Sequence, residues 1–414
     1  MAFLTTLLVG FGLLLPYLSN WEPLKEKILS AASQRLNGDV NYQRLDFSYF
    51  PQPHVKIHQI RLHIPEKWDG VAKSVEVYPE WVALLRGKFQ VRRIHVESPN
   101  VDVRLSKKID QIKEKPGYNL LEKIKEVFAP HSVIVSKMKV TVEDGRLNLY
   151  TESKPLFSFD DLGVRIAMSP EKSRIEMACR SNLWENMKFN LALDPRSLKG
   201  HGHLEVKKFY LHALYHSLLG NFPLNLRDAS TDLRISFMTE GQGDLKATIE
   251  GSIPSLTLGT GENDVVIKGN RLKGTFWVKQ GRMGADLKEW NLKDPHLQLS
   301  GRFQMDPAIH SIQVEIEGRN VDVVSTRRTI SAMAGKSSGI QTIVGYVRGG
   351  TIPRVSLSLS GKSFSDLART ENMILRGRMR EGHLLVPIPL FAEPLDLRKV
   401  RGEVAISKGI LLAK

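Results

Sequence analysis

The segment Gly335-Lys336-Ser337-Ser338-Gly339 is one place where residue types and spacing could support catalysis. It fits the G-x-S-x-G pattern that exposes a serine nucleophile between a strand and a helix. The preceding residues, 329–334, have a helical pattern, and no second motif supplies a histidine or an acid. The segment also resembles the end of a phosphate-binding loop, but Ile330 stands where that loop needs its first glycine. We interpret it as a linker between helices.

Four histidines lie close together and raise the question of a metal site. His201 and His203 would share one face of a strand, and His212 and His216 would share one face of a helix. Both spacings occur among metal ligands. No Asp, Glu or Cys completes a ligand set at motif spacing, and Glu205 is the nearest acid. We therefore expect solvated or partly packed histidines and no metal.

Two adjacent aspartates and a lone cysteine also lack the neighbours that chemistry requires. Asp160 and Asp161 precede Leu162 in a segment of turn character, so we interpret them as turn residues rather than a general acid/base pair. Cys179 is the only cysteine of the chain, which excludes an intramolecular disulfide and a thiolate zinc site. The sequence therefore predicts a protein that is not an enzyme and holds no cofactor.

Apolar residues alternate with polar ones through most of the chain, as in half-buried strands. Clear examples are Leu233, Ile235 and Phe237; Ile312, Val314 and Ile316; and Val355, Leu357 and Leu359. Helical patterns are confined to residues 24–36, 120–128, 209–219 and 323–347. These helices are too few to cover the apolar side of roughly fifteen strands. Either two sheets pack face to face, or one long curved sheet keeps an apolar concave face for a ligand of hydrocarbon character.

The charge of the chain favours an anionic partner. The 59 Lys and Arg exceed the 44 Asp and Glu, which gives a net charge of +15 among 414 residues. Phospholipid headgroups, lipopolysaccharide and nucleic acid all fit such a charge. Residues 323–365 contain basic side chains and no acid, which fits an anionic-lipid contact or an ordinary solvated face. No nucleic-acid-binding motif is present, so nucleic acid is not an expected partner.

The N-terminal residues are apolar enough to anchor the chain in a membrane. Residues 2–18 contain no charge, and as a helix they would span about 26 Å of a hydrocarbon layer of roughly 30 Å. Tyr17 and Trp21 follow where interfacial aromatic residues are expected. We predict an uncleaved transmembrane signal anchor over residues 1–20; a cleaved signal peptide and a buried helix are the alternatives. Its apolar side chains are Phe3, Leu4, Leu7, Leu8, Val9, Phe11, Leu13, Leu14 and Leu15.

The order of these elements resembles the AsmA-like family of bacterial envelope proteins. The likeness lies in arrangement more than in invariant residues. It is carried by residues 38–47 leading into Phe50-Pro51-Gln52-Pro53, by WVALLRG at 81–87, VRRIHVESPNVDV at 91–103, VTVEDGRLNL at 140–149 and FDDLGVRI at 159–166, and by residues 322–353. The family is similar in N-terminal architecture to the chorein-type bridge-like lipid transfer proteins, whose β-groove shields acyl chains.

The resemblance implies a location and a function. The chain would be a single-pass protein of the inner membrane of a Gram-negative cell, with its body in the periplasm. Membrane phospholipid would be its partner, and its role would be phospholipid transport or outer-membrane biogenesis, with outer-membrane assembly proteins as further partners. The resemblance supplies no catalytic residue. The rival hypothesis is a non-transporting β-sandwich scaffold that regulates the assembly of envelope proteins.

The expected fold is mainly β: a long curved antiparallel sheet, groove or taco-like, with a few short helices and one N-terminal transmembrane helix. We expect an anchor at 1–20, an N-terminal module at 21–130, a β-rich middle region at 131–321, and a helical insertion with C-terminal strands at 322–414. Residues 409–412 have the pattern of a strand only just begun, as in a truncated chain. The residues expected to line the lipid groove are Leu147, Leu149, Phe237, Leu297, Leu299 and Phe303.

Overall fold

The structure is a computed structural model that describes most of the chain after residue 38. The described residues are 39–48, 52–65, 68–80, 83, 86, 90–105, 137–151, 154–214, 226–241, 243–258, 264–334, 345–367, 369–386, 393–407 and 410–413. The predicted anchor, the predicted helices at 24–36 and 120–128, and the motif at 335–339 lie outside these residues. Within them, no helix combines the length and apolar character needed to cross a membrane.

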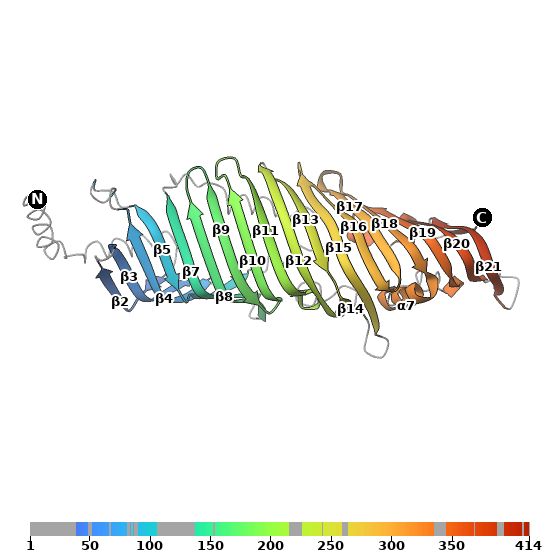
Figure 1. Ribbon diagram of the computed structural model, residues 1–414, viewed down its shortest axis with the longest axis horizontal. Coiled ribbons are helices and arrows are strands. Elements are labelled where there is room, and N and C mark those ends of the chain that lie inside the picture. Colours follow the sequence, from blue (N-terminus) through green and yellow to red (C-terminus); the bar gives the residue numbers. More distant parts are fainter. Residues whose placement is uncertain are drawn as a thin grey trace, which may run out of the picture.

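One sheet of twenty-two strands contains most of the described residues (Figure 1). The strands are β1 (Asp39–Asn41), β2 (Arg44–Ser48), β3 (His54–Ile64), β4 (Trp68–Pro79), β5 (Val91–Glu97), β6 (Asn100–Leu105), β7 (Met138–Thr151), β8 (Lys154–Met168), β9 (Ser173–Ser181), β10 (Trp184–Leu193), β11 (Lys199–Tyr210), β12 (Leu226–Gly241), β13 (Asp244–Ser252), β14 (Ser255–Leu258), β15 (Val265–Lys279), β16 (Arg282–Asp294), β17 (Leu297–Asp306), β18 (Ser311–Asp322), β19 (Val347–Gly361), β20 (Met373–Val386), β21 (Leu395–Ser407) and β22 (Ile410–Ala413). The helical elements with assigned bounds are α7 (Val323–Ala334), α9 (Phe364–Leu367), η1 (Pro307–Ile309) and η2 (Thr370–Asn372). The prediction of a mainly β chain is confirmed.

Strands close in sequence pair with one another, so that the sheet extends along the long axis of the molecule (Figure 1). All of the pairs are antiparallel except those of β5 and β6 with β7, which are parallel. A parallel return needs a crossover of a dozen or more residues, and residues 106–136 supply that length. The described strands thus form one curved sheet rather than two facing sheets. The expectation of a wholly antiparallel sheet is wrong at this one step.

Two predicted helices differ from the structure at their ends. The helix expected from Phe209 begins only after Tyr210, because Phe209 and Tyr210 still pair with β12. The helical stretch expected from Val323 starts as α7, whereas Val347 already belongs to β19. Strand pairing takes precedence over local helical pattern at both positions.

A row of irregular positions divides many strands into two arms. Non-glycine residues with positive φ occur there at Gln59, Ser98, Asp144, Asp161, Lys208, Asn320, Glu381 and Lys399. Neighbouring irregularities contact each other: the Ser98 amide donates to the Glu143 carbonyl at 2.8 Å, and the Lys208 amide donates to Asp232 Oδ1 at 2.8 Å. Because bulges bend strands, we call this row the crease.

Asp160 and Asp161 belong to this crease and not to a turn. Both lie within β8, where the register with β9 shifts between Asp160 and Gly163. Asp160 pairs with Arg146 at 2.7 Å, and Asp161 pairs with Arg180. The turn prediction is wrong because aspartate tolerates the positive φ of a bulge as well as that of a turn.

The buried core follows the crease in two clusters. The larger cluster contains Leu226, Ala229, Leu258, Ile267, Leu292, Leu297 and Val321, and the smaller contains Cys179, Met187 and Val206. The larger cluster includes Ile267 of one arm. Partly buried residues of the other arm, among them Trp290 and Val355, pack against this cluster. The apolar faces of both arms therefore meet inside the bend, which makes the apolar face the inner face of the sheet.

Candidate functional site

The inner face carries a continuous row of apolar residues and glycines. Each residue is the cross-strand partner of the next, from β2 to β20. The row is Leu45, Ile57, Val75, Val96, Val142, Val164, Met177, Phe189, Leu204, Ile235, Ile249, Gly274, Leu287, Gly301, Ile316, Leu357 and Leu375. Neighbouring strands lie about 4.8 Å apart, so these pairings give a path of roughly 75 Å.

A second row on the same face alternates aromatic and small residues. Its central part reads Gly202, Phe237, Ala247, Phe276, Ala285 and Phe303. The Phe237 ring lies over Gly202, where an added Cβ would come within 2.2 Å of Phe237 Cζ. The ring of Phe237 also stacks on that of Phe189 at a centroid distance of 6.0 Å. Small residues thus make room for rings that lie flat on the sheet.

Away from the crease, the inner face is only half-buried. Ile235 and Phe237 remain partly exposed, and Ile316 is 37% exposed. Apart from neighbouring strands, the described elements that pack appreciably on the sheet are α7 against β15, β18 and β19, and α9 and η2 against β19. Most of the row therefore has no second layer over it among the described residues.

The opposite face is polar along the adjacent row. Each residue of this row is again the cross-strand partner of the next, and the row is Asp46, Lys56, Glu76, His95, Thr141, Arg165, Glu176, Asn190, His203, Ser236, Thr248, Thr275, Asp286, Arg302, Glu315 and Ser358. Several are linked across strands, as where Arg302 Nε donates to Asp286 Oδ1 at 2.9 Å. A shift by one residue would exchange the two faces, so this register fixes which side is apolar.

Glu76 lies at the centre of one polar cluster on this outer face. Lys56 Nζ donates to Glu76 Oε1 at 2.9 Å, and the Tyr78 hydroxyl donates to Glu76 Oε2 at 2.8 Å. Partial burial opposes ionisation, but these hydrogen bonds outweigh it, so the pKa of Glu76 is lowered. Arg93 covers the Tyr78 ring, with Cζ 3.7 Å from the centroid. The outer face is therefore held together by charge and hydrogen bonds.

The six residues predicted to line a groove all lie on the inner face. Leu147 and Leu149 are in β7, and Phe237, Leu299 and Phe303 are in β12 and β17; all five are half-buried. Leu297 is 7% exposed and belongs to the larger core cluster. Sequence reasoning missed the small residues under the rings, whose signal is the repeated pairing of glycine or alanine with phenylalanine.

The structure describes three of the four histidines, His201, His203 and His212. His201 and His203 share the outer face of β11, and His203 Nδ1 lies 3.2 Å from Ser236 Oγ. His212 Nδ1 lies 3.1 Å from the Ala229 carbonyl oxygen, and His216 is outside the described residues. In the part of the chain that the structure describes, no three His, Cys, Asp or Glu side chains are grouped as a metal site.

The sequence was compared with protein-family models and with curated proteins. No family model and no curated protein matches this sequence.

Proposed function

We propose that the chain is a membrane-anchored, periplasmic AsmA-like protein whose inner face binds the acyl chains of phospholipids and carries them along the sheet. The observation that supports this most strongly is the continuous inner row from Leu45 to Leu375, which meets no charged or polar residue. Hydrocarbon needs no other chemistry for binding. The outer face, with its paired charges, remains in water.

The energetics of burial favour this assignment. Each buried CH₂ contributes about 0.8 kcal/mol, so an acyl chain that covers part of the row would be held firmly without polar contacts. The row is roughly 75 Å long, whereas the hydrocarbon core of a bilayer is roughly 30 Å thick. Several lipids could therefore lie one after another along the face, as transport requires.

The location rests on the sequence. The apolar residues 2–18 would anchor the chain in the inner membrane, and the resemblance to the AsmA-like family favours a periplasmic body and a role in outer-membrane biogenesis. A scaffold for envelope proteins would also need to cover the inner face, but with a protein partner. The two functions differ in what contacts the inner face in the cell.

Site-specific photo-crosslinking in cells separates them. A photo-reactive amino acid is placed at three inner positions, Leu147, Ile235 and Ile316, in separate variants. Matched outer controls are the adjacent residues Asn148, Ser236 and Glu315. Lipid transport predicts phospholipid adducts at the inner positions and none at the outer ones. Protein adducts at the inner positions without lipid would favour the scaffold and overturn this proposal.

A further inference from the structure

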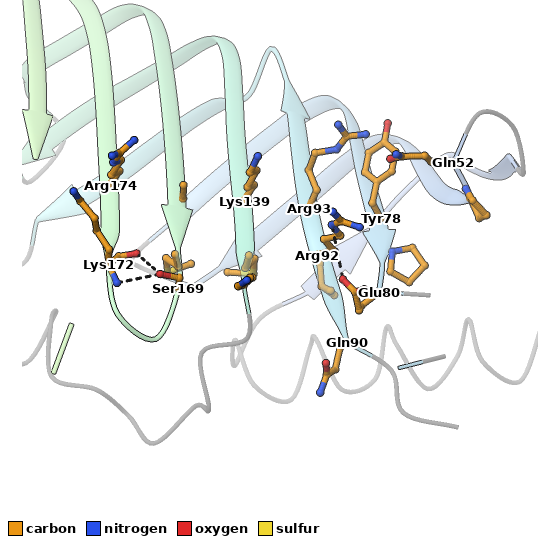
Figure 2. A pocket seen from close by; sticks show the side chains of 17 residues that line it. Gln52, Tyr78, Glu80, Gln90, Arg92, Arg93, Lys139, Ser169, Lys172 and Arg174 are labelled. Atoms are coloured by element: carbon orange, nitrogen blue, oxygen red, sulfur yellow. Dashed lines mark hydrogen bonds and ion pairs between the residues drawn. The ribbon is translucent and has the colours of Figure 1, made fainter. Parts of the chain in front are cut away.

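One rim of the sheet contains a basic pocket of about 800 Å³ (Figure 2). It lies where β4 and β8 end and where β5, β7 and β9 begin. Its basic lining residues are Arg92, Arg93, Lys137, Lys139, Lys172 and Arg174. Glu80 is its one acidic lining residue among those described. Six cations against one acid make the pocket strongly attractive to an anion.

Most of these cations have no counter-charge among the residues that the structure describes. Arg92 Nε lies 3.8 Å from Glu80, and Arg93 covers the ring of Tyr78. The other four, Lys137, Lys139, Lys172 and Arg174, form no side-chain ion pair or hydrogen bond within the described residues. Elsewhere on the outer face, basic side chains such as Arg302 and Arg180 are paired. Within the described part of the chain, the pocket is thus a concentration of uncompensated positive charge.

The strand register places the cations around an open position. Arg93 is the partner of Lys139, Lys139 of Ala167, and Ala167 of Arg174. The short side chain of Ala167 therefore leaves space between two long basic ones. Figure 2 shows Arg174, Lys139 and Arg93 in one row on β9, β7 and β5, with the β8 strand of Ala167 between the first two and with Lys172 and Ser169 nearer the strand ends. This arrangement suits a compact anion with several acceptor oxygens, such as a phosphate group.

Apolar side chains reach the same rim from the inner face. Met138 and Met168 line the pocket, and they are cross-strand partners. They lie two residues beyond Val140 and Ile166, which are paired on the inner face. Cationic and apolar surfaces therefore meet at this rim over a short distance.

We propose that the pocket binds the phosphate of an anionic phospholipid headgroup while the acyl chains pass over the rim onto the inner face. This inference rests on the proposed function, because it assumes that the inner face holds acyl chains. It adds a specific site and a preference for lipids with net negative charge. Free phosphate has the same chemistry, and the test distinguishes the two sources.

The test compares two triple variants of the full chain. The rim variant carries Lys139→Gln, Lys172→Gln and Arg174→Gln. The control variant carries Lys246→Gln, Arg376→Gln and Arg380→Gln, which remove the same charge from exposed sites on β13 and β20. Each protein, purified in mild detergent, is equilibrated with vesicles of equal phosphatidylglycerol and phosphatidylcholine, and the bound lipids are quantified by mass spectrometry.

We expect the lipid bound to the native protein and to the control variant to be enriched in phosphatidylglycerol. In the rim variant, the ratio of bound phosphatidylglycerol to phosphatidylcholine should be about fivefold lower, at unchanged total lipid. An unchanged ratio in the rim variant would overturn the headgroup site but leave the proposed function intact. Absence of any bound lipid in the native protein would overturn both. Titration with inorganic phosphate completes the test: rim-dependent phosphate binding without a change in lipid ratio would assign the pocket to free phosphate, against the proposal.

Discussion

The core clusters inside the bend at the crease and the parts of the arms away from it are both apolar, but they differ in how completely they are covered. Leu258, in the larger core cluster, is 1% exposed, and Met379, at the bulge of β20, is 2% exposed. On the arms, Ile316 is 37% exposed, and Ile235 is half-buried. Since hydrophobic stabilisation follows the area removed from water, the crease should supply most of the stability. The arms keep apolar area free for a ligand.

Truncation at the crease should have the largest effect. We expect Leu258→Ala to lower the free energy of unfolding by about 2–5 kcal/mol, because it leaves a cavity in a packed cluster. Urea unfolding followed by circular dichroism measures this. Ile235→Ala on the arm should cost about 1 kcal/mol, because part of that side chain is already in water. Equal costs at the two sites would contradict the division between crease and arms.

A second variant tests whether the arm is packed tightly where rings cover small residues. Gly202→Ala places a Cβ under the Phe237 ring, and we expect a loss of about 1–3 kcal/mol from overpacking. The matched control is Gly163→Ala, since a Cβ there finds its nearest neighbour only at 4.0 Å. Phe237→Leu combined with Gly202→Ala should recover part of the loss. If Gly202→Ala costs no more than Gly163→Ala, the ring does not lie on the glycine.

The sequence predicted the strands and the apolar face because the two-residue period encodes both. It did not predict the crease, since a bulge depends on where a strand loses register with its partner. Asp160 and Asp161 show this: their types fit a turn, but pairing with β9 on both sides keeps them in a strand. The sequence also did not predict that β5 and β7 pair in parallel. Alternation of apolar and polar residues indicates a strand but not the direction of its neighbour.

The basic pocket was beyond sequence reasoning for a related reason. Arg93, Lys139 and Arg174 come from three strands separated by long stretches of chain, and no local motif joins them. Along the sequence, residues 323–365, which contain basic side chains and no acid, indicated an anion-binding surface more strongly than these three residues did. Its Arg354, however, is paired with Glu317 at 2.6 Å. Charge in three dimensions thus differs from charge along the chain.

A charge on the arm should affect lipid more than stability. We expect Ile235→Glu to reduce the lipid bound by the purified protein about fivefold, because a carboxylate in the row opposes the burial of an acyl chain. Its cost in stability should stay near 1 kcal/mol, since the site is partly exposed and the charge can remain hydrated. Ser236→Glu places the same charge on the outer face and should leave bound lipid unchanged. Similar losses from both variants would indicate a general electrostatic effect rather than a lipid path.

The smallest expected effect is the pH dependence that Glu76 contributes on the outer face; the inner row contains no titratable side chain. Hydrogen bonds from Lys56 and Tyr78 keep the pKa of Glu76 below its ordinary value of 4.5 despite partial burial. The unfolded chain therefore takes up the proton first as pH falls, so this stabilisation is present above pH 4.5 and is lost as pH falls through the lowered pKa. We expect Glu76→Gln to cost about 0.2–1 kcal/mol at neutral pH and nothing in strong acid. Urea unfolding across this range measures it, with the exposed Glu315→Gln as the control. Equal pH profiles for the two variants would show that the Glu76 cluster does not contribute to the stability of the outer face.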